Sequence, residues 1–137
     1  MFKTTRVVAL LVALALVPAA FAAKGGNGNA GVKGSDPTLV MVNDVNGNGL
    51  PNYGDTVSFN VTTTAAYPAL QLACYQNGAL VFDQTAGFFP TYAGSKNFTL
   101  WDDRWAGGAA DCTATLYTTS SSGKQTTLAT TGFHVDA

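Results

Sequence analysis

Apolar and polar side chains alternate along most of the chain after residue 37, and this period of two predicts β-strands separated by turns. The clearest run is 56–64, where Val57, Phe59 and Val61 would face one way and the hydroxyl and amide side chains between them the other. Seven strands are expected, at 38–43, 56–64, 69–76, 79–85, 96–101, 110–119 and 126–135. We find no convincing helical period among them. The pattern predicts an all-β fold, an antiparallel β-sandwich.

Turn residues separate these expected strands. Asn77-Gly78 lies between the third and fourth strands and indicates a two-residue hairpin, because both positions tolerate the positive φ of a type I′ turn. The aromatic segment 87–94 is expected to be a loop or a broken strand.

The first 23 residues have the pattern of a secretory signal peptide. Two basic residues precede an uncharged apolar run, residues 7–17, and Pro18 and a small-x-small cleavage signal follow it. The run is too short to cross a bilayer, which takes about 20 residues. We expect cleavage near Ala22 or Ala23, and a mature chain that is secreted and not inserted in a membrane.

Glycine and asparagine dominate residues 24–36, which predicts a flexible leader before a single domain, residues 37–137. Only 11% of the residues are charged, against about 25% in an average protein, and glutamate is absent. Without Lys3 and Arg6 of the signal, five basic residues face eight aspartates, a net charge of −3. This composition excludes nucleic acid as a partner and disfavours helical bundles.

Both cysteines, Cys74 and Cys112, lie on the apolar faces of expected strands. In a secreted chain with no third thiol this predicts a structural disulfide. The bond would close a loop of about 38 residues and stabilise the fold by roughly 4 kcal/mol. Two reduced, buried cysteines are the alternative.

Residues 44–55 carry oxygen side chains at the spacing of a calcium-binding loop. The candidate ligands are Asp44, Asn46, Asn48, Leu50, Asn52 and Asp55. The last position holds Asp55 instead of the longer glutamate, and the expected flanks are extended instead of helical. The alternative is turn chemistry between two strands. No cofactor is required, and calcium is the only candidate ion.

The stretch DVNGNGLPNYGDTVSFNVTTT, residues 44–64, resembles the opening of the immunoglobulin-like repeats of bacterial cell-surface proteins. Gly54-Asp55 and the alternating Val57, Phe59 and Val61 carry the match. The resemblance implies an immunoglobulin-like sandwich that serves as a stalk, spacer or adhesion module without enzymatic activity. The sequence departs from the repeats in being a lone domain. Cys74 also falls on the third expected strand instead of the second, which puts a disulfide between the two sheets in doubt.

Aromatic residues are the second set of candidates for binding. Trp105, which follows Asp102-Asp103-Arg104 and precedes two glycines, is the best candidate for an exposed platform, and Tyr92 is the next. Exposed aromatic faces stack on sugar rings or anchor protein contacts, and packing in the core is the alternative for both residues. Three others are expected to fill the core: Trp101, Phe98 and Phe88.

Catalytic groups are scarce. His134 is the only histidine, no GxSxG motif is present, and turn or surface placement explains Asp102, Asp103 and Asp111 more simply than paired-carboxylate hydrolysis does. One histidine and two oxidised cysteines make no zinc site. We therefore expect no enzyme.

The sequence thus predicts a secreted, non-catalytic binding or structural module, an adhesion domain whose partner is an extracellular protein or polysaccharide. Two alternatives stay open. One is a calcium-assisted carbohydrate-binding module that uses Trp105 and Tyr92. The other is a subunit of an extracellular fibre, in which the leader links a strand of one copy to a sheet edge of the next.

Overall fold

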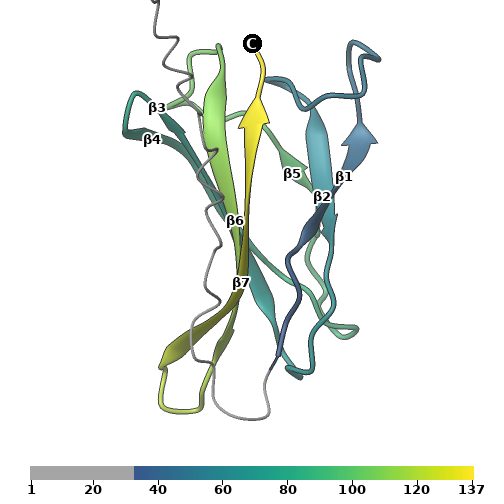
Figure 1. The fold of residues 1–137 in the computed structure, drawn as a ribbon, viewed down its shortest axis with the longest axis vertical. Coiled ribbons are helices and arrows are strands. Elements are labelled where there is room, and N and C mark those ends of the chain that lie inside the picture. Colours follow the sequence, from purple (N-terminus) through teal and green to yellow (C-terminus); the bar gives the residue numbers. More distant parts are fainter. Residues whose placement is uncertain (1–32) are drawn as a thin grey trace, which may run out of the picture.

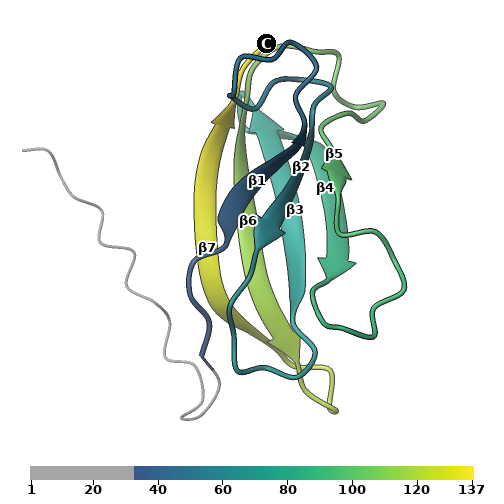
Figure 2. The ribbon, with the colours of Figure 1, turned by 90° about the vertical axis from the view of Figure 1, so that its right-hand side faces the viewer.

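The computed structural model describes residues 33–137, and these residues form two antiparallel sheets and no helix. The strands are β1 (Thr38–Asn43), β2 (Thr56–Asn60), β3 (Ala69–Gln76), β4 (Ala79–Gly87), β5 (Phe98–Thr99), β6 (Ala110–Thr119) and β7 (Gln125–Val135). One sheet has the order β1-β2-β5 and the other β4-β3-β6-β7. The sheets lie face to face (Figures 1 and 2), so the expected all-β sandwich of seven strands is confirmed.

Some expected segments fall outside residues 33–137: the signal peptide and residues 24–32 of the leader. Within the described part of the chain, no segment is a helix long and apolar enough to span a bilayer.

Two strands are shorter than expected because other contacts take over their main-chain groups. β2 ends at Asn60, and residues 62–64 pair instead with residues 33–35 through Ser35 N to Thr62 O (3.0 Å) and Thr64 N to Lys33 O (2.9 Å). β5 keeps only Phe98–Thr99. Before it, the carbonyl of Lys96 accepts the hydroxyl of Ser58 (2.8 Å). After it, Leu100 forms main-chain hydrogen bonds with Gly54 (2.9 Å) and Asp55 (2.8 Å), which precede β2. The end of the expected leader is therefore hydrogen-bonded to the domain.

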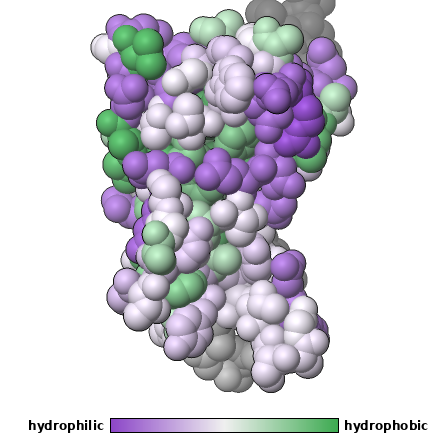
Figure 3. Space-filling view, turned by 180° about the vertical axis from the view of Figure 1, so that it is seen from behind, coloured by the Kyte–Doolittle hydropathy of each residue, from purple (hydrophilic) through white to green (hydrophobic). Residues whose placement is uncertain are grey.

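The core forms where the apolar faces of the two sheets meet. Val57 and Phe59 of β2 are buried as expected, and the Phe59 ring lies 5.9 Å from Phe98 of its own sheet and 6.1 Å from Phe133 of the other. Val61, beyond the end of β2, is partly buried against this core. The face seen in Figure 3 is mixed, with green hydrophobic residues in small groups among purple and white ones.

The hairpin between β3 and β4 has the expected turn. Asn77 and Gly78 both have positive φ, 48° and 80°, and Gln76 pairs with Ala79 across them. The prediction of a two-residue turn from Asn-Gly is confirmed.

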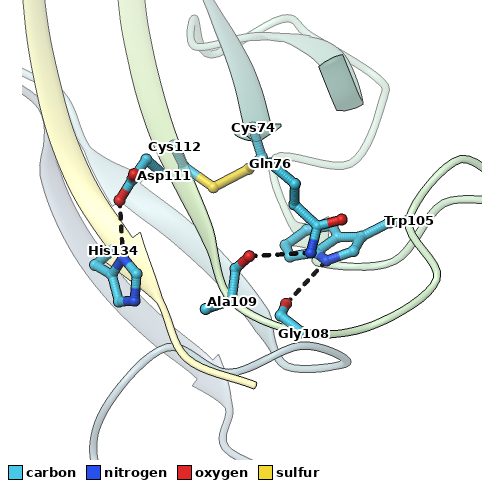
Figure 4. Close-up of a disulfide and its surroundings, with 8 residues drawn as sticks. All are labelled: Cys74, Gln76, Trp105, Gly108, Ala109, Asp111, Cys112 and His134. Atoms are coloured by element: carbon cyan, nitrogen blue, oxygen red, sulfur yellow. Dashed lines mark hydrogen bonds and ion pairs between the residues drawn. A yellow bond between two sulfur atoms is a disulfide. The ribbon is translucent and has the colours of Figure 1, made fainter. Parts of the chain in front are cut away.

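The expected disulfide joins Cys74 to Cys112, and both residues are buried. They are directly opposite each other on β3 and β6, which are neighbours in one sheet (Figure 4). The bond therefore lies within a sheet and fixes the β3–β6 register. A disulfide between the two sheets, which the position of Cys74 on the third strand argues against, is not formed.

Candidate functional site

The loop between β1 and β2, residues 44–55, is built around the buried carboxylate of Asp55. This side chain is 0% exposed, and its two oxygens accept the main-chain N–H groups of Val45 (2.8 Å) and Asn52 (2.9 Å). Because the two amides lie near opposite ends of the loop, Asp55 closes it.

Three more oxygen side chains of the loop accept hydrogen bonds from main-chain N–H groups. Asp44 accepts from Gly47 (2.8 Å) and Gly49 (2.7 Å). Asn46 accepts from Asn48 (3.0 Å), and Asn48 accepts from Leu50 (2.8 Å). These bonds are the turn chemistry that the sequence offered as the alternative to calcium.

Asn52 differs from the other candidate calcium ligands. It is buried, its Nδ2 donates to the Ala137 carbonyl (3.3 Å), and its Oδ1 has no hydrogen-bond partner among the described residues. Residues 33–137 contain no group of three acidic, histidine or cysteine side chains that could hold a metal ion. An amide oxygen without a hydrogen-bond partner is able to coordinate a cation. Calcium binding at this loop therefore stays a prediction.

Trp105 is buried, with 1% of its surface exposed, and the prediction of an exposed platform at this residue is wrong. Its indole N–H donates to the Gly108 carbonyl (3.0 Å; Figure 4), and its ring packs edge-on against Tyr53 (5.2 Å) and Phe82 (6.4 Å). Gly107 and Gly108 both have positive φ, 91° and 85°, which turns the loop so that this carbonyl meets the indole.

Trp101 is 56% exposed, so the prediction that it fills the core is also wrong. Phe98 and Leu100 occupy the inward positions of this segment and are fully buried, which leaves Trp101 on the opposite side. Of the three residues expected in the core, Phe98 is buried there and Phe88 stacks on it with a ring separation of 6.5 Å.

Asp102, Asp103 and Asp111, the candidates for a catalytic carboxylate pair, have no hydrogen-bond partner in common. Asp102 accepts from Arg104 through its side-chain Nε (2.9 Å), its Nη2 (3.0 Å) and its main-chain N–H (2.9 Å), and these bonds lower the pKa of Asp102 to about 2. Asp111 instead contacts His134, and Asp103 is exposed. An ionised, paired Asp102 is a poor general acid.

His134 lies between two carboxylates on an exposed part of β6 and β7. Its Nδ1 is 2.8 Å from Asp111 Oδ1 (Figure 4), and its Nε2 is 3.6 Å from Asp136 Oδ1. The hydrogen bond to Asp111 is the largest cause of a raised pKa of His134, and the negative charges of both aspartates add to it.

Three aromatic rings form a row on the segments that precede β3 and follow β4. Tyr67 and Phe89 are 5.2 Å apart and edge-to-face, and Phe89 and Tyr92 are 5.5 Å apart in the same kind of arrangement. Tyr67 is 68% exposed, while Phe89 and Tyr92 are half-buried. We call Tyr67, Phe89 and Tyr92 the aromatic row.

The sequence pointed to Tyr92 but missed Tyr67. Tyr67 precedes β3 and Phe89 follows β4, so nothing local connects them. They meet because Ala69 pairs with Gly87 at the ends of these strands and Phe88 N donates to Pro68 O (2.8 Å). A signal for the pair could have come only from working out the hairpin register from Asn77-Gly78.

Gly87 and Gly94 leave the space that the Tyr92 ring occupies. A Cβ atom added to Gly87 would stand 2.5 Å from Tyr92 Cδ2, and one added to Gly94 would stand 2.5 Å from its Cζ. Any other residue at either position would push the ring away. The ring is therefore held by close packing in its loop.

A cleft of about 360 Å³ is lined by residues 33–35 and 62–64. Its walls include the side chains of Lys33, Ser35 and three threonines. The hydroxyls of Thr63 and Thr64 are hydrogen-bonded to the main chain of Lys33. The loop between β2 and β3 contributes to both this cleft and the aromatic row, because it carries residues 62–64 and then Tyr67.

Comparisons with known proteins add no relative: the chain matches no protein-family model, no curated protein and no solved structure.

Proposed function

We propose that this protein is a secreted, non-catalytic extracellular binding module, an immunoglobulin-like adhesion domain that binds through its aromatic row. The observation that carries the proposal is the combination of exposure and fixed geometry in the row. Tyr67 presents most of its ring to solvent, and it packs on Phe89, which packs on a Tyr92 fixed between two glycines. Rigid, exposed aromatic side chains are typical of binding hot spots.

The strand order supports the immunoglobulin-like part of the proposal. Sheets of order β1-β2-β5 and β4-β3-β6-β7 correspond to strands A-B-E and C′-C-F-G of that fold, with a C′ strand beside C as in variable-type domains. The disulfide differs from that fold's usual one, because it joins the positions of strands C and F.

Secretion is supported by two independent features. The first is the signal-peptide pattern of residues 1–23, and the second is the disulfide, a bond that persists in oxidising compartments.

The two alternatives fare differently. A calcium-assisted carbohydrate-binding module loses Trp105 as a platform but keeps Tyr92 and the unpartnered Asn52 Oδ1. Calcium binding at the loop would raise the melting temperature of the mature protein over that in chelator, and Asn52→Ala would reduce the rise. The fibre subunit, in which the leader links a strand of one copy to a sheet edge of the next, stays a prediction. Residues 33–35, at the end of the leader, pair with residues 62–64 of their own chain.

Binding to cell-envelope material of the producing organism tests the proposal. Labelled mature protein is expected to sediment with this material, and Tyr67→Ala to lose most of the retention. Tyr75→Ala is the matched control: Tyr75 is 43% exposed and lies eight residues further along, at the other end of β3, roughly 26 Å away. Equal retention of the Tyr67 and Tyr75 variants, or no retention of the wild type, would overturn the proposal.

A further inference from the structure

We propose that β1 is a pairing edge, where a second copy of this chain adds its own β1, antiparallel, to form a two-fold symmetric dimer. The three-stranded sheet of one copy then continues into that of the other in the order β5-β2-β1-β1′-β2′-β5′. The proposal goes beyond the proposed function, because it concerns the assembly of the domain and depends on no ligand.

β1 lies at an edge of its sheet, and its apolar side chains are incompletely covered. The sheet order β1-β2-β5 leaves one side of β1 without a neighbouring strand among the described residues (Figure 1). The strand contains four consecutive apolar residues, 39–42, yet none of its six residues is buried. Leu39 and Met41 are partly buried against the core, and Val42 is 49% exposed. A further strand beside β1 would bond to the main-chain groups of its open side and cover these side chains.

The other three edge strands carry features that hinder such pairing. β5 has only two residues, Phe98–Thr99, and β4 carries Asp83 at its middle. β7 has a bulge at Leu128, which is skipped in the register with β6. Short strands, charged side chains and bulges are devices by which natural sheet edges avoid pairing. In β1, Thr38–Met41 pairs with β2 without interruption and the register shift comes only after it, so β1 is the least protected edge.

The charge and symmetry of β1 favour a second copy as its partner. Residues 37–43 contain no charged side chain, so two copies with a net charge of −3 each can approach one another along this strand. Two identical strands that pair antiparallel are related by a two-fold axis, which closes the assembly at two copies. In a register centred on Met41, Val40 of each copy lies opposite Val42 of the other, and no two charged residues are opposite each other.

The size of the contact sets the strength of the dimer. A strand of six residues is about 20 Å long, and a contact of that length along one edge is smaller than the roughly 800 Å² that each partner contributes to a standard interface. We therefore expect a weak dimer that dissociates on dilution. The dimer carries two aromatic rows, and two linked binding sites hold a repetitive surface more firmly than one.

Analytical ultracentrifugation of the mature, disulfide-bonded protein tests the proposal without any ligand. We expect monomers at about 1 μM and a growing fraction of dimer toward roughly 500 μM. Val42→Asp places a charge on each of the two paired strands and should weaken the association at least about tenfold. Leu80→Asp is the matched control, because Leu80 is a 36%-exposed apolar residue of a different edge strand, β4, and its replacement should leave the association unchanged.

Amide hydrogen exchange of the wild type provides a second measurement that needs no variant. The amides of residues 38–43 should exchange more slowly at high protein concentration than at low, whereas those of β4 should not change. Sodium chloride at about 1 M should not weaken the dimer, because no ion pair holds it. An end-to-end association through the charged loops would instead be dissociated by salt.

Circular dichroism establishes that each variant is folded. Monomers at every concentration, equal weakening by the two aspartate variants, or dissociation of the dimer by salt would each overturn the proposal. Tyr67→Ala should dimerise as the wild type does, because the aromatic row lies outside β1. Failure of the proposed function and failure of the dimer are therefore distinguishable.

Discussion

Asp55 is the residue on which the loop between β1 and β2 depends most. Replacing it with alanine leaves the N–H groups of Val45 and Asn52 without their acceptor inside a buried site. Hydrogen bonds to a charged group contribute about 1.5–3 kcal/mol, and unpaired buried donors add a penalty. We expect Asp55→Ala to lower the free energy of unfolding by about 3 kcal/mol, measured by urea denaturation.

Asp44→Ala is the control for this prediction, because Asp44 also accepts two main-chain amides of the loop. Its hydrogen bonds are exposed, so water can replace the lost carboxylate. The expected loss is below about 1 kcal/mol. Equal losses in the two variants would show that burial of Asp55 is not what makes it important.

His134 gives the fold a pH dependence whose sign follows from its raised pKa. The hydrogen bond to Asp111 favours the protonated imidazole in the folded protein, so folding is stabilised when histidine is charged. The stabilisation is complete below the ordinary histidine pKa, about 6.5, and disappears as the pH rises through the higher pKa of the folded state.

As the pH rises from about 6 through the raised pKa of His134, the urea midpoint of the wild type should therefore fall more than that of His134→Gln does. In NMR titrations, Asp111→Asn should bring the pKa of His134 down toward its ordinary value, because the largest cause of the shift is removed. An unchanged pKa in Asp111→Asn would contradict the assignment.

The two tryptophans show what the sequence could and could not predict at this scale. The exposure of Trp101 follows from the alternation of Phe98 and Leu100, and strict use of the period of two would have predicted it. The burial of Trp105 depends on the carbonyl of Gly108 and on the rings of Tyr53 and Phe82. Those contacts are tertiary, so the sequence pattern around Trp105 does not predict its burial.

At the scale of elements, strands with strong alternation were predictable and their ends were not. β1, β3 and β6 have the expected bounds, because apolar residues alternate along them and turn residues flank them. β2 ends early because residues 62–64 pair with residues 33–35. The aromatic row was only one-third predictable for the same reason: Tyr67 joins it through the pairing of β3 with β4.

The disulfide is the element-scale contact with the largest expected effect on stability. It joins residues 38 apart, and the loop it closes contains β4, β5 and two rings of the aromatic row, Phe89 and Tyr92. Chain entropy predicts a stabilisation of roughly 4 kcal/mol for a loop of this size.

We expect the double variant Cys74→Ala, Cys112→Ala to lose about that amount in guanidinium denaturation. Reduced wild-type protein, in which the cysteines are retained, serves as the control and should be similarly destabilised. A loss of stability below about 1 kcal/mol would contradict this prediction. It would show that β3 and β6 keep their register without the covalent bond and that the unfolded chain is equally compact without it.

On the scale of the whole molecule, few ionic contacts hold the domain together. Among the described residues, the pairs are Arg104 with Asp102 and His134 with Asp111 and Asp136, and all of them lie at least partly in solvent. Apolar packing holds the two sheets against each other. Within the sheets, main-chain ladders join the strands, and the disulfide joins β3 to β6. Hydroxyl and amide side chains make up much of the surface, in keeping with a sequence that is only 11% charged.

Stability should therefore be nearly independent of sodium chloride, because exposed ion pairs contribute about 0–1 kcal/mol and salt screens only that contribution. At pH 8 we expect the free energy of unfolding in urea to change by less than about 0.5 kcal/mol between 0.05 M and 0.5 M NaCl. Arg104→Gln, which removes the Asp102 pair, should reduce even this small dependence. Sodium sulfate is the positive control, since it strengthens apolar burial and should stabilise the domain. A loss of more than about 1 kcal/mol in sodium chloride would mean that charges contribute more to this fold than its exposed pairs can supply.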